Sequence, residues 1–332
     1  MSFTLDDRTI LVTGGTGSFG RKFIATALHR HRPRKVIVFS RDEAKQWDMS
    51  LDPSFRGRRE LRYFIGDVRD RERLEMAFRG VDYVVHAAAL KHIPAAEYNP
   101  FECIQTNVHG AENVVRAAMR AGVKRVVALS TDKAANPINL YGASKLASDK
   151  IFVAARHMVG DGDPLFAVVR YGNVVGSRGS VVPLFRRLIA DGAKTMPITD
   201  ARMTRFWITL QQGVEFVLSC FAMMRGGEIF VPKIPSMKVT ELAAVMAPNL
   251  PIETIGIRPG EKLHEAMITE ADARDTVELP DRYVIRPPGY GAGRSYHAEQ
   301  RQPPEEFEYA SDTNPVWLTR EEMRALLAEL DG

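Results

Sequence analysis

Short apolar runs that alternate with helix-length segments are the feature that most constrains the fold of this chain. Charge or glycine bounds each run. Six runs lie before residue 172, at 10–12, 36–39, 63–65, 83–85, 126–129 and 166–169. Continuous apolar runs of this length are typical of strands buried on both faces. Because helix-length segments separate most of them, we predict a doubly wound α/β fold with a parallel sheet.

The remaining pattern divides the chain into two parts. Helices are predicted at 18–31, 71–79, 108–121 and 141–158. We expect a first domain at 1–172, joined by later segments near 205–232, and a smaller domain over 173–332 that mainly binds substrate. Prolines throughout 280–316 indicate an extended surface chain. A capping box at 319–322 then predicts a final helix with an apolar face.

Composition excludes several classes of protein. The 45 basic and 41 acidic residues leave a net charge of +4, and both signs are scattered, so no basic tract for nucleic acid stands out. No stretch approaches the roughly 18 apolar residues of a membrane helix. Cys103 and Cys220 are the only cysteines. We therefore expect a cytoplasmic protein that binds no nucleic acid, membrane or metal.

A glycine-rich turn follows the first predicted strand. Residues 13–20 read TGGTGSFG, and the next helix is predicted to begin within them. Glycine lets the backbone turn tightly and approach a diphosphate, while the helix N-terminus offers unpaired N–H groups. This context favours a dinucleotide site over a purely structural turn. The expected cofactor contacts here are Gly14, Thr16, Gly17, Ser18, Phe19 and Gly20.

Three further strand ends bear on the cofactor. Ser40 and Arg41 follow the second strand, where a hydroxyl and a guanidinium suit a 2′-phosphate, so NADP is favoured over NAD. The alternative is that Asp42 binds an NAD ribose. Asp67 and Val68 follow the third strand and are expected at the adenine, although Asp67 could instead cap a helix. The small residues Ala87 and Ala88 follow the fourth strand and would let a cofactor lie against the backbone.

A second group of residues is suited to moving protons. Tyr141 and Lys145 are four residues apart, on one face of a predicted helix. A nearby cation would lower the pKa of the phenol so that it can take a hydroxyl proton, and Thr131 could bind the same oxygen. A surface pair is the alternative. Asp132 and Lys133 add an acid and a base that elimination requires, although an exposed ion pair explains them equally well.

The run from 130 to 145, STDKAANPINLYGASK, resembles the inverting UDP-N-acetylglucosamine 4,6-dehydratases of pseudaminic acid synthesis, in the extended short-chain dehydrogenase/reductase superfamily. Segments at 39–43, 89–92, 170–174 and 257–262 extend the likeness. Related polysaccharide dehydratases typically carry methionine where Tyr141 stands. The resemblance implies a Rossmann-type fold, a nicotinamide cofactor and a homo-oligomer, either a dimer or a hexamer.

The resemblance also implies roles in a redox-neutral cycle. Tyr141, with Lys145 and Thr131, would deprotonate the sugar C4 hydroxyl as hydride leaves. Lys133 would remove the C5 proton and Asp132 would protonate the departing C6 hydroxyl. The product would be UDP-2-acetamido-2,6-dideoxy-β-L-arabino-hex-4-ulose. As a base, Lys133 is expected to have a lowered pKa. The residues expected to bind the UDP-sugar are Lys91, Asn173, Arg205, Arg258 and Glu261.

A 4-epimerase and a C5-retaining dehydratase of the same superfamily remain open as alternatives. An epimerase would oxidise and reduce C4 without using Asp132 and Lys133. A non-enzymatic dinucleotide-binding module is disfavoured, because both Tyr141 and Lys145 are present.

Overall fold

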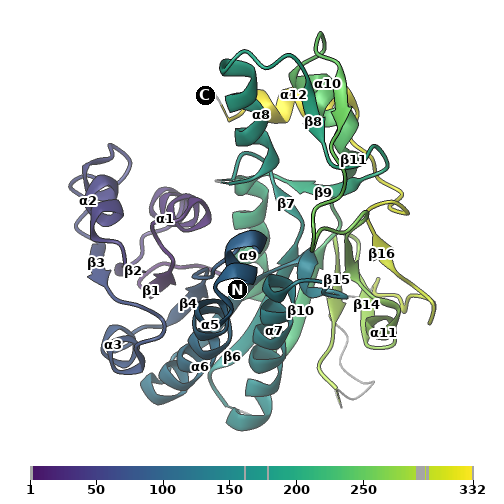
Figure 1. The fold of residues 1–332 in the computed structure, drawn as a ribbon. Coiled ribbons are helices and arrows are strands. Elements are labelled where there is room, and N and C mark those ends of the chain that lie inside the picture. Colours follow the sequence, from purple (N-terminus) through teal and green to yellow (C-terminus); the bar gives the residue numbers. More distant parts are fainter. Residues whose placement is uncertain (1–2, 161, 178, 289–295, 297–298, 331–332) are drawn as a thin grey trace.

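A nine-stranded sheet forms the centre of the molecule (Figure 1). The computed structural model describes residues 3–160, 162–177, 179–288, 296 and 299–330. All six predicted strands are present and parallel, in the spatial order β3-β2-β1-β4-β5-β6. Their bounds are β1 Thr9–Thr13, β2 Lys35–Ser40, β3 Leu61–Ile65, β4 Tyr83–His86, β5 Arg125–Thr131 and β6 Leu165–Tyr171. The predicted α/β fold class is confirmed.

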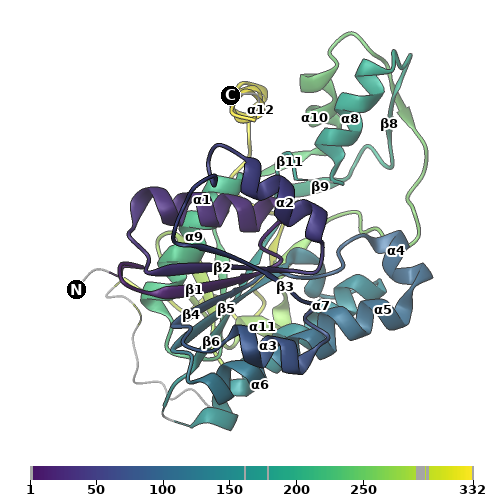
Figure 2. The same cartoon turned by 90° about the vertical axis from the view of Figure 1, so that its left-hand side faces the viewer.

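Helices cover both faces of the sheet (Figure 2). On one face lie α1 (Ser18–Arg30), α2 (Glu43–Leu51) and α9 (Leu210–Met223), and α1 packs against α9. The other face carries α3 (Arg71–Ala77), α6 (Gly110–Ala121) and α7 (Leu140–Val159). Four of these match predicted helices. The sequence analysis missed α2, α4 (Ile93–Tyr98) and α5 (Pro100–Ile104), because short helices with few apolar residues leave little periodic signal.

The second half of the chain completes the sheet. Strand β10 (Glu228–Pro232) pairs in parallel with β6, and β15 (Arg282–Ile285) and β14 (Thr276–Glu278) continue antiparallel. All four residues of β15 are buried. The prediction of an extended surface chain over 280–316 is therefore wrong at its start. Residues 289–295 and 297–298 of that segment lie outside the described residues.

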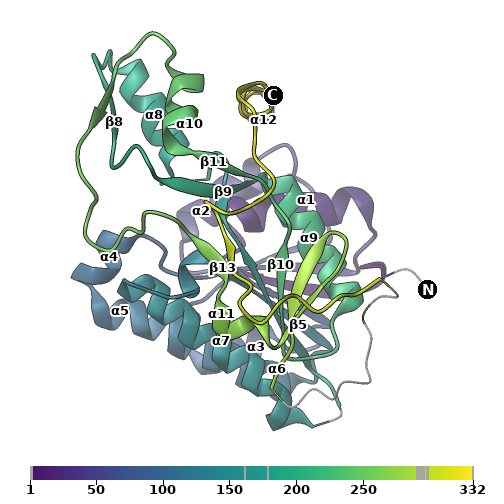
Figure 3. The same ribbon diagram turned by 90° about the vertical axis from the view of Figure 1, so that its right-hand side faces the viewer.

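A smaller unit stands beyond the carboxyl edge of the sheet (Figure 3). Strands β7 (Asn173–Val174), β9 (Thr204–Ile208) and β11 (Ser236–Lys238) form one small sheet, and β8 (Met196–Ile198) pairs with β12 (Ile252–Thr254). Helices α8 (Val181–Ala190), α10 (Val239–Met246) and α12 (Arg320–Ala328) enclose a separate apolar core. The predicted capping box of α12 is present, with Thr319 accepting from the Glu322 N–H, and Met323 is fully buried.

A short connection joins the two parts. Strand β13 (Ala266–Ile268) pairs with β16 (Tyr309–Ala310), and α11 (Glu270–Ala273) follows β13. Just before β13, the chain passes the end of β5, so residues near 265 meet residues near 132. This contact between distant segments places a side chain in the site described below.

Candidate active site

A cleft of about 1070 Å³ separates the carboxyl edge of the sheet from the smaller unit. Ligands of doubly wound proteins bind at this edge. Each site residue that the sequence predicted lines this cleft. On the sheet side these are Gly14, Thr16, Gly17, Ser18, Phe19, Gly20, Ser40, Arg41, Asp67, Val68, Ala87, Ala88, Lys91, Thr131, Asp132, Lys133, Tyr141 and Lys145, and opposite them are Asn173, Arg205, Arg258 and Glu261.

The glycine-rich turn between β1 and α1 has the geometry of an anion site. Gly14 has a φ of +65°, and a Cβ there would lie 2.9 Å from the backbone of Ala87 and Ala88. A Cβ on Gly20 would lie 2.6 Å from Gly15 Cα. Among the described residues no side chain caps α1 at Gly17. The first N–H groups of α1 therefore remain available to a diphosphate.

At the end of β2, the two candidate ribose contacts, Arg41 and Asp42, have different surroundings. The Asp42 carboxylate accepts from the Lys45 N–H at 3.0 Å and caps α2, and hydrogen bonds from Lys45 lower its pKa. The Arg41 guanidinium is half exposed and lies 3.8 Å from Asp67. Ser40 accepts from Gln46 Nε2 at 3.0 Å. Both residues line the cleft, where Arg41 keeps a partly exposed guanidinium and the Asp42 carboxylate caps α2.

Asp67 does not cap a helix. Helix α3 begins at Arg71 and its cap is Asp70, which accepts from the Arg73 N–H at 2.9 Å. Asp67 instead accepts from the backbone and guanidinium of Arg69. The alternative interpretation of Asp67 as a helix cap is therefore wrong, and its carboxylate lies at the cleft.

Tyr141 and Lys145 lie in the first turns of α7, and both are buried. Burial raises the pKa of Tyr141 to about 12, although Lys133 and a hydrogen bond with Thr131 oppose the rise. The expected lowering of the phenol pKa is therefore wrong for this state of the protein. Lys145 Nζ donates to the Leu129 carbonyl at 2.7 Å, and burial lowers the pKa of Lys145.

Sequence reasoning missed three buried polar residues near Lys145, namely Asp149, Ser130 and Arg170. Asp149, one turn beyond Lys145 on α7, accepts from Ser130 Oγ at 2.8 Å and from Arg170 Nη2 at 3.3 Å. Burial raises the pKa of Asp149, while Arg170 and Lys145 oppose that rise. Arg170 also donates to the Met267 carbonyl. The spacing of Lys145 and Asp149 was the available signal, since residues four apart share a helix face.

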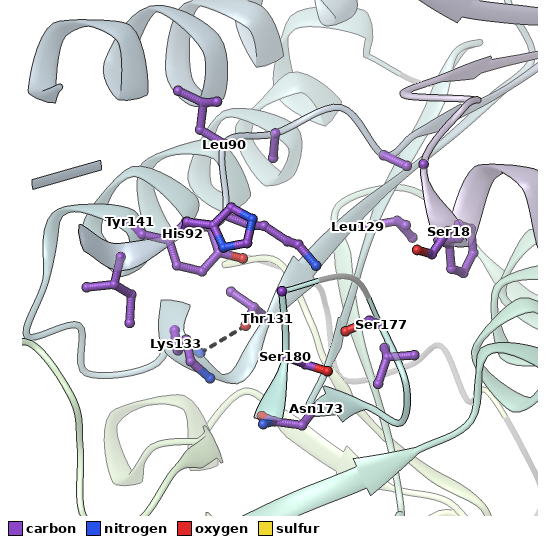
Figure 4. A pocket seen from close by; sticks show the side chains of 18 of the residues that line it. Ser18, Leu90, His92, Leu129, Thr131, Lys133, Tyr141, Asn173, Ser177 and Ser180 are labelled. Atoms are coloured by element: carbon purple, nitrogen blue, oxygen red, sulfur yellow. Dashed lines mark hydrogen bonds between the residues drawn. The ribbon is translucent and has the colours of Figure 1, made fainter. Parts of the chain in front are cut away.

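Asp132 and Lys133 form a close pair at the end of β5. Figure 4 shows Lys133 beside Thr131, whose Oγ1 accepts from the Lys133 backbone N–H at 3.3 Å. Asp132 Oδ1 accepts from Thr131 Oγ1 at 2.8 Å and from Lys133 Nζ at 3.0 Å. On its other side, Lys133 Nζ lies 3.2 Å from Glu265 Oε1. Burial alone would lower the pKa of Lys133, but the two carboxylates outweigh it and raise the pKa. The expected lowered pKa is wrong, because Asp132 and the unforeseen Glu265 together outweigh burial.

The substrate side of the cleft differs from expectation at one arginine. The Arg205 guanidinium is buried and donates to the carbonyls of Thr204, Lys262 and Leu263. Three of its five N–H donors are used in this way, so Arg205 is less open than the phosphate fork that the sequence suggested, and its role as a phosphate ligand stays a prediction. The Arg258 side chain is half exposed, 3.8 Å from Glu261, and keeps its donors available.

Two further residues extend this side. Asn173 lies on β7 and points into the cleft in Figure 4. Arg187, on α8, also lines the cleft, and sequence reasoning missed it because nothing in the pattern of α8 distinguishes it from a surface cation.

On the sheet side, Lys91 lines the cleft after β4, and burial lowers its pKa.

Metal and membrane features were searched over the described residues. In that part of the chain, no group of three or more His, Cys, Asp or Glu side chains is arranged to hold a metal ion. No helix there is both long and apolar enough to span a bilayer.

Relatives with different printed activities match nearly the whole chain. UDP-N-acetylglucosamine 4,6-dehydratase (inverting) of Campylobacter jejuni subsp. jejuni serotype O:23/36 (strain 81-176) is 55% identical over 332 residues, covering 98% of both chains. UDP-glucose 4-epimerase of Rickettsia akari is 40% identical and covers 98% of this chain and 96% of its own.

Solved structures agree on the fold. Pen from Bacillus thuringiensis superposes with a TM-score of 0.90 at 36% identity, covering 99% of both chains. DesIV, the dTDP-glucose 4,6-dehydratase from Streptomyces venezuelae solved with NAD and TYD bound, gives a TM-score of 0.68 at 27% identity over 77% of this chain and 86% of its own.

A Rossmann-type sheet with a Tyr-x-x-x-Lys helix at its carboxyl edge defines the chain as an extended short-chain dehydrogenase/reductase. Within that class, residues 10–287 match the family described as polysaccharide biosynthesis protein, and the chain belongs to this family. The resemblance to inverting UDP-N-acetylglucosamine 4,6-dehydratases is confirmed at 55% identity.

His86, at the end of β4, gives a prediction about acid stability. It pairs with Thr13 Oγ1 at 2.8 Å and packs against Phe152, and burial lowers its pKa to about 3. The unfolded chain binds this proton near pH 6.5 and the folded chain does not, so stability falls as pH drops below 6.5. Between pH 7 and 5 the histidine should account for about 2 kcal/mol.

We therefore expect His86→Gln to lose less stability than the unsubstituted protein over that interval, as measured by urea unfolding at each pH. His157→Gln, at an exposed site on α7, is the control. Parallel pH profiles for His86→Gln and the unsubstituted protein would contradict the assignment.

Proposed function

We propose that this protein is an inverting UDP-N-acetylglucosamine 4,6-dehydratase that uses NADP. The observation that carries the proposal is the convergence of Tyr141, Asp132 and Lys133 at one point of a cleft that also contains a dinucleotide cradle. The 55% identity to a dehydratase of this name supports it. We further propose a homo-oligomer that acts in the cytoplasm on the pathway to pseudaminic acid or a related surface glycan.

The residues of the cradle fit a phosphorylated nicotinamide dinucleotide. The α1 N-terminus and Gly14 suit the diphosphate, and Arg41 with Ser40 suits a 2′-phosphate. When bound, the nicotinamide supplies a reversible hydride acceptor. Because that hydride is returned within one cycle, the enzyme needs no second redox substrate.

The protein side chains handle the protons. Tyr141, hydrogen-bonded with Thr131, takes the C4 hydroxyl proton as C4 is oxidised. The resulting ketone acidifies the C5 hydrogen. Neutral Lys133 then takes the C5 proton while Asp132 gives its proton to the C6 oxygen, and water leaves. Hydride would return to C6, and a proton equivalent to the one that Tyr141 took from the C4 hydroxyl would be delivered to C5 on the opposite face, which inverts that centre.

The resting pair differs from its reactive form by one proton. Lys133 as ammonium and Asp132 as carboxylate, 3.0 Å apart, become amine and carboxylic acid when one proton crosses that contact. Elimination returns the pair to the ammonium and carboxylate form. The raised pKa of Lys133 is therefore compatible with a basic role. The reaction then proceeds through the amine and carboxylic acid form, which is less stable than the ammonium and carboxylate form.

A 4-epimerase is the second candidate, because a relative of that name covers nearly the whole chain at 40% identity. Epimerisation leaves C6 untouched and gives no role to Asp132 or Lys133.

Incubation with UDP-N-acetylglucosamine in deuterated water separates these functions. We expect a product that has lost one water without net reduction, with deuterium at an inverted C5, as read by mass spectrometry and NMR. A product with C6 chemistry unchanged would establish the epimerase, and retention at C5 would establish the other dehydratase.

Two substitutions separate the proton steps. Lys133→Ala should abolish water loss while some cofactor reduction persists, because C4 oxidation does not need this amine. Tyr141→Phe should slow cofactor reduction itself, by about 10²- to 10⁴-fold. Single-turnover absorbance at 340 nm together with product analysis measures both steps. Lys150→Ala and Tyr98→Phe, both exposed, are the matched controls. Normal turnover by Lys133→Ala would remove the base assignment.

The cofactor assignment depends on Arg41. Loss of a charge-assisted phosphate contact costs roughly 1.5–3 kcal/mol, so Arg41→Ala should weaken NADP binding by about 10- to 100-fold and leave NAD binding nearly unchanged. Isothermal titration with each dinucleotide measures the ratio, and Arg56→Ala, at an exposed position of the same domain, is the control. Equal losses for both dinucleotides would contradict a role in reading the 2′-phosphate.

A further inference from the structure

Glu265 is a buried carboxylate in the cleft that the sequence analysis did not single out. It precedes β13, lines the cleft and is 2% exposed. Its backbone is held on both sides, since its N–H donates to Ser311 Oγ at 3.0 Å and its carbonyl accepts from the Ser311 N–H at 2.7 Å. A buried carboxylate needs charged or hydrogen-bonded partners, so the contacts of its two oxygens indicate its role.

The two oxygens have different surroundings. Oε1 lies 3.2 Å from Lys133 Nζ and 3.9 Å from Arg205 Nε. Oε2 lies 3.8 Å from Lys262 Nζ and, among the described residues, has no hydrogen-bond partner. The same is true of Asp132 Oδ2. Both oxygens are enclosed by protein, so each is a buried acceptor that no hydrogen bond within the described residues satisfies.

The position of Lys133 between two carboxylates is the central observation. Its ammonium contacts Asp132 at 3.0 Å on one side and Glu265 at 3.2 Å on the other. Transfer of its proton to Asp132 would leave Glu265 facing a neutral amine, which loses their attraction. Glu265 therefore opposes the proton shift that the elimination needs. The charged and titratable groups that face Lys133 are Asp132, Glu265, Arg205, Lys262 and Tyr141.

We propose that Glu265 is a positioning residue that fixes the Lys133 ammonium and sets how readily this lysine becomes a base. The inference deepens the proposed dehydratase function and rests on it for its catalytic meaning. No atom is gained or lost, since one proton moves from Lys133 to Asp132.

Competitive labelling with acetic anhydride tests the inference without any assay of activity. The rate at which the Lys133 amine is acetylated between roughly pH 7 and 11, read by peptide mass spectrometry, gives its pKa. In the unsubstituted protein we expect this pKa to lie above the ordinary lysine value of about 10.4. Glu265→Gln should raise the acid dissociation constant of Lys133 at least about tenfold, because one carboxylate is lost.

Glu265→Asp keeps the negative charge but places it farther from the Lys133 ammonium, so the pKa of Lys133 should be intermediate. Glu270→Gln, an exposed carboxylate on α11, should leave Lys133 unchanged. An unchanged value in Glu265→Gln would overturn the proposal. If that buried variant does not fold, a Lys133 pKa below the ordinary value in the unsubstituted protein would overturn it equally.

The pH profile of water loss gives the catalytic counterpart. The reactive pair holds one proton, so activity falls as pH rises through the pKa of Lys133. That fall should occur at lower pH in Glu265→Gln than in the unsubstituted enzyme, whereas a merely structural role would lower activity equally at every pH. If the unsubstituted protein formed no dehydrated product, the proposed function would fail, while the labelling result would still decide the role of Glu265.

Discussion

The common edge of a parallel sheet is the constraint on which the site depends. Strands β1, β2, β4, β5 and β6 run in one direction, so the residues that follow them meet along a single line. The glycine-rich turn, the Arg41 region and the Thr131 to Lys133 segment are therefore neighbours in space although they are far apart in sequence. The smaller unit lies opposite this edge of the sheet, and the space between the two is the cleft.

Burial of charge is the second determinant of the chemistry. Asp132 and Glu265 are almost fully enclosed, and each retains an oxygen with no partner among the described residues. Such atoms reduce stability unless a ligand satisfies them. Their retention at the point where Lys133 and Tyr141 also converge is typical of a site that is organised for binding and proton transfer at the expense of stability.

The sequence predicted the elements whose signals are local. Buried strands showed as apolar runs, the Gly14 turn showed as a glycine pattern, and Tyr141 with Lys145 showed as a helical spacing. Glu265 gave no such signal, because its contact with Lys133 joins residues that are 132 positions apart in the sequence. The predicted pKa directions of Lys133 and Tyr141 were wrong because burial raises the pKa of Tyr141, and because Asp132 and the distant Glu265 together outweigh the effect of burial on Lys133. The sequence likewise contained no sign that the Arg205 guanidinium donates to backbone carbonyls, because those carbonyls include ones from residues 262 and 263.

The most direct test of this account is a crystal structure with cofactor and UDP-N-acetylglucosamine bound. The account predicts that Lys133 Nζ lies within about 3.5 Å of C5 and that the Asp132 carboxyl faces the C6 oxygen. A complex in which the Lys133 ammonium points to solvent, away from the hexose, would contradict the elimination mechanism and leave only a dinucleotide-dependent oxidation at C4.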